Sequence, residues 1–207
     1  MLVDSVEELD AGGVSDESAV SGGKMKLGTL VLMLALLAAP ACGGGGGGSD
    51  AGGSPSAIAA SFVPDQPTPG ANTVAMAEGA KTNDVVTVNV TLTSTNGVYA
   101  TAFDAVYDEI HTVFLGFAPG TALEQGGNNT NYTVNTANPG RVVVGVSRTG
   151  SGTTNVSGTK VVLGLQFRVN QAGVYPVAIE NAVVYDGQSS PQPISGINWF
   201  AGAVTGV

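Results

Sequence analysis

The sequence predicts an all-β protein: an antiparallel β-sandwich of jelly-roll topology with about nine strands, preceded by a signal-peptide helix and a disordered tether. Three observations lead to this prediction. Apolar and polar residues alternate over short runs, most clearly in DVVTVNVTLT at Asp84–Thr93. Turn signals such as Asn96-Gly97 and Asp186-Gly187 separate the runs. The composition is rich in Gly, Thr, Asn, Val and Ala, which favours strands and turns over helices.

Residues 1–24 are an acidic prefix with no basic residue before Lys24. Because a signal peptide needs positive charge ahead of its apolar core, this prefix opposes export. We therefore expect translation to begin at Met25, which would make residues 1–24 a mis-assigned start or a disordered prefix.

Residues 25–41 have the proportions of a lipoprotein signal peptide. The apolar run at 27–39 has 13 residues and would make a helix of about 20 Å, which is too short to span a bilayer. The run ends in Ala-Pro-Ala-Cys, which resembles the lipobox of bacterial lipoproteins. By that resemblance, Cys42 would be diacylated on its sulfur and would become an acylated N-terminus. The alternative is an ordinary secretory signal cleaved after Ala41, with Cys42 incidental.

A lipid on Cys42 would hold the mature chain at the periplasmic face or the cell surface of a bacterium, and the membrane would be contacted through that anchor only. Cys42 is the only cysteine, so an intramolecular disulfide is impossible. Residues 42–57 are a Gly-rich tether without the apolar residues that a core needs. From Cys42 onward, ten acidic and five basic residues give a formal charge of −5, which argues against nucleic acid as a partner.

Residues 58–207 form the predicted sandwich domain. At Val98–Asp108 the aromatic residues Tyr99, Phe103 and Tyr107 share one side of the strand, which indicates that this side is inward. The expected strands lie, in chain order, at 58–63, 84–93, 98–108, 113–117, 141–147, 160–169, 174–179, 183–185 and 202–207, with weaker candidates at 73–77 and 132–135. The segments at 125–140 and 149–158 are expected to be loops, since Gly, Asn, Ser and Thr dominate them.

Several landmarks follow one another along this domain at characteristic spacings. They are Asp84–Val88, Phe103, Tyr107-Asp108, Phe114, Phe117, Pro119-Gly120, Leu123, Gly140 before Val142–Val146, Gly158 before Leu163, Leu165 and Phe167, Asp186-Gly187 and Gly202–Thr205. Their order resembles that of a cohesin domain, the jelly-roll module of cellulosome scaffoldins. The resemblance extends over residues 74–207. It implies a non-catalytic module that binds a dockerin-like protein module in polysaccharide degradation or surface assembly.

The resemblance also locates a contact site. In the best-known cohesins an Asn-x-Asp pair, on the strand that ends in Tyr-Asp, contacts the dockerin. Here Ala100 and Ala102 occupy those positions, and the acidic contact expected near Thr149 is missing, so the standard recognition residues are absent.

In their place, the outward residues of three strands expected to adjoin one another would make a flat face of small residues, of a kind that often marks an interaction site. The predicted partner-binding residues are Ala100, Ala102, Asp104, Val106, Val143, Gly145, Val162 and Gly164. The alternatives are that loops or the 58–70 segment cover this face, or that it is an ordinary sheet surface.

A carbohydrate-binding surface protein of the same fold is the second interpretation. Exposed aromatic rings stack on sugars, and the candidates are Tyr132, Tyr185 and Trp199, although Trp199 is equally suited to the core. An enzyme is the third interpretation. It would have to use His111, the only histidine, or a carboxylate pair such as Asp104 and Asp108. Because no nucleophile motif accompanies them, we expect no catalytic residues.

No cofactor and no metal site are expected, because one histidine and scattered carboxylates do not make a transition-metal site. Asp186-Gly187 near Asn181 could bind calcium, but Asp-Gly is more often only a turn.

Overall fold

The computed structural model describes residues 57–124 and 129–207. The expectations for the prefix at 1–24, the signal peptide at 25–41, the lipidation of Cys42 and the tether up to residue 56 therefore lie outside the described residues. Within the described ranges, no helix long and apolar enough to cross a membrane is present.

The described chain folds into ten strands joined by turns, which confirms the all-β prediction. The strands are, in chain order, β1 (Ala60–Pro64), β2 (Thr73–Thr82), β3 (Val85–Tyr107), β4 (Thr112–Pro119), β5 (Thr130–Asn135), β6 (Arg141–Arg148), β7 (Thr154–Val169), β8 (Gly173–Asp186), β9 (Asn198–Phe200) and β10 (Gly202–Gly206).

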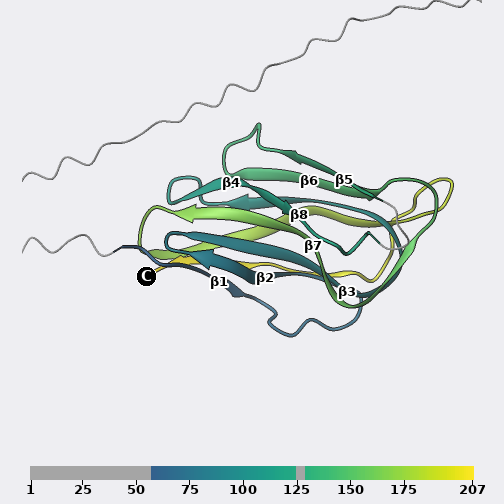
Figure 1. Ribbon diagram of the computed structural model, residues 1–207, viewed down its shortest axis with the longest axis horizontal. Helices are drawn as coiled ribbons and strands as arrows, with labels where there is room; N and C mark the ends of the chain where they lie inside the picture. Colours follow the sequence, from purple (N-terminus) through teal and green to yellow (C-terminus); the bar gives the residue numbers. More distant parts are fainter. Residues whose placement is uncertain (1–56, 125–128) are drawn as a thin grey trace, which may run out of the picture. The chain divides into compact units, whose positions relative to one another are not determined.

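The ten strands are hydrogen-bonded into one continuous sheet, which folds into two layers that share β3. We refer to the layers as two sheets, and Figure 1 shows the course of the strands. The N-terminal half of β3 pairs with β2 and β7, and the neighbours β9 and β4 complete the order β9-β2-β3-β7-β4. The C-terminal half of β3 pairs with β6 and β8, and β5, β10 and β1 complete the order β5-β6-β3-β8-β10-β1. All of these pairings are antiparallel except that of β2 with β9. This arrangement confirms the antiparallel β-sandwich of jelly-roll type.

One feature of β3 differs from the prediction, which placed separate strands at 84–93 and 98–108. The two runs are one strand, and the Asn96-Gly97 turn signal bends it from one sheet into the other. Ser94 and Gly97 have positive φ angles of 42° and 70° at this bend. The backbone N–H of Gly97 donates a hydrogen bond to Oδ1 of Asn155, 2.9 Å away, which holds the bend against β7.

Two other strands also run further than their sequence patterns suggest. β7 begins at Thr154, inside the segment expected to be a loop, and β8 runs continuously through the predicted strands at 174–179 and 183–185. Both strands contain register shifts where they pair with β3. A bulge changes which side of the sheet the following residues face, so simple alternation fails beyond it.

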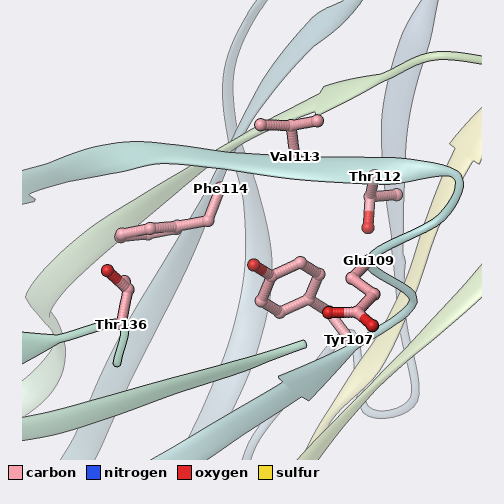
Figure 2. Close-up of a pocket in the computed structure, with 6 residues that line it drawn as sticks. All are labelled: Tyr107, Glu109, Thr112, Val113, Phe114 and Thr136. Atoms are coloured by element: carbon pink, nitrogen blue, oxygen red, sulfur yellow. The ribbon is translucent and has the colours of Figure 1, made fainter. Parts of the chain in front are cut away.

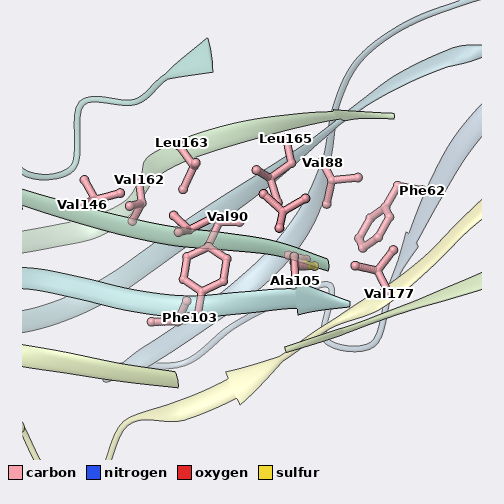
Figure 3. Close-up of a cluster of buried hydrophobic side chains, with 14 of the residues drawn as sticks. Phe62, Val88, Val90, Phe103, Ala105, Val146, Val162, Leu163, Leu165 and Val177 are labelled. Carbon is pink, nitrogen blue, oxygen red and sulfur yellow. The ribbon is translucent and has the colours of Figure 1, made fainter. Parts of the chain in front are cut away.

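The core lies between the two sheets, and side chains from both, such as Phe62, Val90 and Phe103, point into it (Figure 3). On β3 the alternating residues Val86, Val88, Val90 and Leu92 are completely buried, as the pattern predicted. The core therefore consists mainly of valine, leucine and phenylalanine, with Trp199 packed at its margin.

Candidate partner-binding face

The candidate site is the outward side of β5, β6, the C-terminal half of β3 and β8, which we call the small-residue face. Its residues are Asn131, Thr133 and Asn135 on β5, Arg141, Val143, Gly145 and Ser147 on β6, Ala100, Ala102, Asp104 and Val106 on β3, and Ala178, Glu180, Val183 and Tyr185 on β8. Six of the eight predicted residues, all those on β3 and β6, lie together here.

The other two predicted residues, Val162 and Gly164, do not belong to this face, because β7 pairs with the other half of β3. Val162 is also buried, with 2% of its surface exposed. It lies at the register shift between Val90 and Thr91, which turns it inward. Gly164 is buried beneath Thr87 and Asn89 on the outer side of the opposite sheet. Beside the C-terminal half of β3, the neighbouring strand is β8 and not β7 as the sequence suggested.

The centre of the small-residue face is flat because its side chains are short. One row across the four strands reads Thr133, Gly145, Ala102 and Val183, in register. Gly145 has an ordinary backbone angle and open space above it, since a Cβ there would meet only the Cβ of Thr133 at 3.8 Å. Val143 in the next row is 41% exposed and is the most prominent apolar side chain of the face.

The alternative that the 58–70 segment covers this face does not agree with the position of strand β1. The segment at 60–64 is strand β1, which pairs edge-on with β10 and so extends the same sheet. Ala100, Ala102 and Val106 are each partly exposed. The face is therefore accessible along β3.

A charged cluster lies at one end of the small-residue face and centres on Asp104, which is only 8% exposed. Arg141 donates from Nη1 to Asp104 Oδ2 at 2.6 Å and from Nη2 to Glu180 Oε2 at 2.5 Å. The amide of Asn181 donates to the same Asp104 oxygen at 2.7 Å. The carboxylates of Glu180 and Asp104 raise the pKa of Arg141 above its ordinary value. The cluster gives the face a fixed polar end.

Sequence reasoning missed Arg141, Glu180 and Asn181 as members of this site. The alternation that placed Asp104 outward was correct, and Arg141 shares its side of β6. Asn181 is a bulge residue with a positive φ of 49°, and its position opposite Asp104 depends on the register shift in β8. One signal in the sequence pointed to this cluster: Asp104 was expected to point outward among small residues, and such a carboxylate needs a basic side chain of the same chain beside it.

The three aromatic candidates for sugar stacking are only partly exposed. Tyr132 points to the inner side of β5, where its hydroxyl donates to the Gly120 carbonyl at 2.7 Å and its ring contacts Phe117. Burial raises the pKa of Tyr132 above its ordinary value. Trp199 packs against Phe103 with ring centroids 6.2 Å apart. Tyr185 alone lies on the small-residue face.

His111 and the two aspartates considered for catalysis have separate structural partners. The ring nitrogen Nδ1 of His111 lies 2.7 Å from Asp108 Oδ2, and the ring stacks on Tyr175 at 4.9 Å. The hydrogen bond from His111, together with backbone N–H groups, lowers the pKa of Asp108. Asp104 is instead bound to Arg141. The His111–Asp108 pair stabilises the turn between β3 and β4, where the Thr112 hydroxyl also donates to the Asp108 carbonyl.

Asp186 is used as a turn residue. Its Oδ1 accepts hydrogen bonds from the backbone N–H groups of Gln192 at 2.8 Å and Gln188 at 3.4 Å. Asn181, the second residue considered for calcium, is bound to Asp104 instead. Across residues 57–124 and 129–207, no three metal-ligating side chains cluster.

Comparison with known proteins identifies the family. The sequence matches the cohesin domain over residues 71–198, whereas no curated protein matches it. The structure is similar to a chain of the CaDoc0917–CaCohA2 complex, whose CaCohA2 comes from Clostridium acetobutylicum, with 21% identity, a TM-score of 0.50 and coverage of 59% of this chain and 89% of that chain. It is also similar to the seventh ScaB type I cohesin from Pseudobacteroides cellulosolvens, with 17% identity, a TM-score of 0.51 and coverage of 64% and 90%. These likenesses show the fold, and the family match covers most of the chain, so this chain belongs to the cohesin domain family.

Proposed function

We propose that this chain is a non-catalytic binding module that docks a dockerin-like protein partner on the small-residue face. The single observation that supports this most is the continuity of the face: four adjacent strands present short side chains at its centre, with no covering segment among the described residues. The family is one of non-catalytic, protein-binding modules.

The shape of the face suits a partner that approaches closely with its backbone. With Gly145 and Ala102 side by side in one row, a helix or strand of the partner can lie directly on the sheet. Protein interfaces commonly combine an apolar centre with a polar margin. Here Val143, Ala102 and Val106 supply apolar surface, and the Arg141 cluster supplies the polar margin.

The charged cluster would orient the partner rather than supply most of the affinity. Asp104 already has its partners within the chain, so docking need not leave a buried carboxylate unpaired. Glu180 is about half exposed, since 48% of its side chain is accessible, and it remains able to accept a hydrogen bond from the partner. Charged groups at an interface margin mainly set orientation and association rate.

We further propose that the module acts outside the cytoplasm, held to a bacterial membrane by a lipid on Cys42, in a polysaccharide-degrading or surface-assembly system. The support is the export signal and lipobox-like sequence at 25–42, followed by the Gly-rich tether. Cys42→Ala should release the chain from the membrane fraction and abolish incorporation of labelled palmitate. A chain that stays in the membrane fraction without Cys42 would contradict the lipid anchor.

The docking face is tested with the full-length chain as bait against the secreted proteins of its host, in parallel with insoluble and soluble polysaccharides. Ala102→Arg places a long cation at the centre of the face. Ala80→Arg makes the same change at an exposed site on β2, in the other sheet. We expect Ala102→Arg to abolish capture of a dockerin-bearing protein and Ala80→Arg to preserve it.

Two results would contradict this proposal. Unchanged capture by the Ala102→Arg variant would place the interface elsewhere on the domain. Polysaccharide binding that is lost on Tyr185→Ala, without any captured protein, would favour the carbohydrate-binding function instead.

A further inference from the structure

A small open cavity of about 250 Å³ lies where β3 ends and β4 begins. It is lined by Tyr107, Glu109, Thr112, Val113, Phe114 and Thr136. The side chains of Tyr107, Phe114, Glu109 and Thr136 lie around a common space in Figure 2. Tyr107 directly follows Val106 on β3 and Thr136 directly follows Asn135 on β5, so the cavity adjoins one end of the small-residue face.

The two aromatic rings of the cavity are fixed in place by the core. Tyr107 and Phe114 both pack edge-on against buried Phe167, with ring centroids 5.2 Å and 5.7 Å away. Each ring is partly exposed toward the cavity. The aromatic wall is therefore preformed, and a ligand would not have to order it.

The single charge of the cavity belongs to Glu109, an exposed residue over the Gly140 turn. A Cβ on Gly140 would lie 3.8 Å from Glu109 Oε2, which locates the carboxylate beside that turn. Of the described basic residues, none forms an ion pair with Glu109: Arg141 binds Asp104 and Glu180, and Arg168 binds Asp84. The cavity therefore has an uncompensated negative charge.

Burial raises the pKa of Tyr107, and the nearby Glu109 carboxylate raises it further. The phenol thus stays neutral at physiological pH and contributes a polarisable ring and a hydroxyl. Because Glu109 and Tyr107 line the same cavity, a cation held by the carboxylate would lie close to the ring.

We propose that this cavity binds the cationic side chain of a lysine or arginine supplied by a polypeptide. The ammonium or guanidinium group would pair with the Glu109 carboxylate, and its aliphatic stem would lie along the rings of Tyr107 and Phe114. A cation over an aromatic face gains a favourable interaction with the ring quadrupole. The inference rests on the proposed function only for the source of the cation, a partner docked on the adjoining small-residue face.

A sugar fits the cavity less well than a cation. Sugar recognition relies on an open aromatic platform together with several hydrogen-bonding groups. Here Phe167 covers one side of both rings, and the Thr112 hydroxyl is already committed to the Asp108 carbonyl. The carboxylate without a counter-charge is the dominant chemical feature.

The test uses the full-length chain and two matched probes observed by NMR through the ring resonances of Tyr107 and Phe114. N-acetyl-lysine methylamide carries the cation, and N-acetyl-norleucine methylamide has the same aliphatic stem without it. We expect saturable shifts with the lysine probe only. Glu109→Gln should weaken that binding about two- to fivefold, which is the size of effect expected for the loss of one exposed ion pair while the aromatic rings stay in place. Glu124→Gln, in the segment that follows the end of β4, should leave it unchanged.

Three outcomes would overturn the inference: equal shifts with both probes, no loss of affinity in the Glu109→Gln variant, or shifts of the same rings by glucose or cellobiose but not by lysine. The same variants separate this inference from the proposed function. If Ala102→Arg abolishes partner capture while Glu109→Gln leaves lysine binding intact, the docking face stands and the cavity assignment fails. If lysine binding depends on Glu109 while the Ala102→Arg variant captures its partner normally, the cavity assignment stands and the docking face fails.

Discussion

The outer surfaces of the two sheets have similar sequence patterns, but they differ in the free space above their glycine residues. On the small-residue face, Gly145 has open space above it. On the outer surface of the β9-β2-β3-β7-β4 sheet, a Cβ on Gly164 would lie 2.7 Å from Thr87 Cγ2 and 3.1 Å from Asn89 Oδ1. Both glycines alternate with buried residues in sequence. One is a position where a partner can approach, and the other is a packing requirement.

The two surfaces also differ in their ion pairs. Arg141 and Asp104 have side chains that are 29% and 12% exposed and approach to 2.6 Å, with Asn181 as an additional donor. On the opposite surface, Arg168 and Asp84 are 48% and 43% exposed and lie 3.4 Å apart. Solvent screens the second pair far more than the first. The small-residue face thus has short side chains at its centre and a closely paired charged cluster at one end.

The largest expected effect is a difference in the free energy of unfolding between valine substitutions at Gly164 and at Gly145. Gly164→Val should lower the free energy of unfolding by about 1–3 kcal/mol, because the new side chain overlaps Thr87 and Asn89. Gly145→Val should change it by less than about 0.5 kcal/mol, since a Cβ there meets only the Cβ of Thr133 at an ordinary 3.8 Å. Urea unfolding measures both. Equal losses at the two sites would remove the distinction between an open and a packed surface.

The next largest effect concerns the ion pairs. Asp104→Ala should cost about 2 kcal/mol of unfolding free energy, because it removes charged hydrogen bonds from Arg141 and Asn181 in a mostly buried place. Asp84→Ala should cost less than about 1 kcal/mol. A double-mutant cycle of Asp104 with Arg141 would show whether the loss arises from that pair. An interaction energy near zero would mean that Asp104 and Arg141 do not stabilise the fold as a pair.

Tyr132→Phe tests whether Tyr132 is structural. Removing its hydroxyl breaks the hydrogen bond to the Gly120 carbonyl, so the free energy of unfolding should fall by about 1 kcal/mol. Binding to polysaccharide should be unaffected. A Tyr132→Ala variant, which removes the ring, would support the stacking role if it kept its stability and lost polysaccharide binding.

The smallest effect appears as a pH dependence at the edge strand β1. Glu78 accepts a hydrogen bond from the Phe62 backbone N–H at 2.9 Å, and this bond, with a smaller contribution from Lys81, lowers the pKa of Glu78. A carboxyl whose pKa is depressed by folding stabilises the fold above its unfolded pKa, about 4.3 for glutamate, and loses that contribution as pH falls through the folded pKa. The stability difference between the native chain and Glu78→Gln should therefore shrink below about pH 4.

Urea unfolding at pH 7 and pH 3 measures that difference. Lys81→Met provides the control, because it removes only the smaller contribution and should leave most of the pH dependence in place. A Glu78→Gln variant whose stability deficit is the same at both pH values would show that Glu78 does not fasten β1 through its charge.

Strand identity and the inward set of most strands could be predicted from the sequence, because alternation reports directly on burial. Val86, Val88 and Val90 are fully buried, as the pattern requires, and so is Phe103 with its neighbour Ala105. The order of landmarks also sufficed to identify the family. What alternation cannot report is which strand lies beside which, since pairing is set by long-range contacts.

That limit explains the errors in the predicted site. Because Asn96-Gly97 bends β3 rather than reversing it, the strand joins both sheets, and β7 and β8 pair with different halves of it. A register shift then turns Val162 inward. Neither the bend nor the shift has a local signature that separates it from an ordinary turn or a regular strand. The charged cluster was missed for the same reason, since Arg141 and Asp104 are adjacent only through pairing.

The meeting of the first and last described strands has a mechanical consequence. Ala59 and Val207 exchange two backbone hydrogen bonds of 2.8 Å and 3.1 Å, and the start of β1 and the chain end lie at the same corner in Figure 1. Tension applied at the two ends of the described domain would thus act first on this corner, where β1 and β10 pair at the edge of their sheet. A circular permutant that joins these two residues and opens at the exposed turn after Gly187 should fold normally and bind like the native chain.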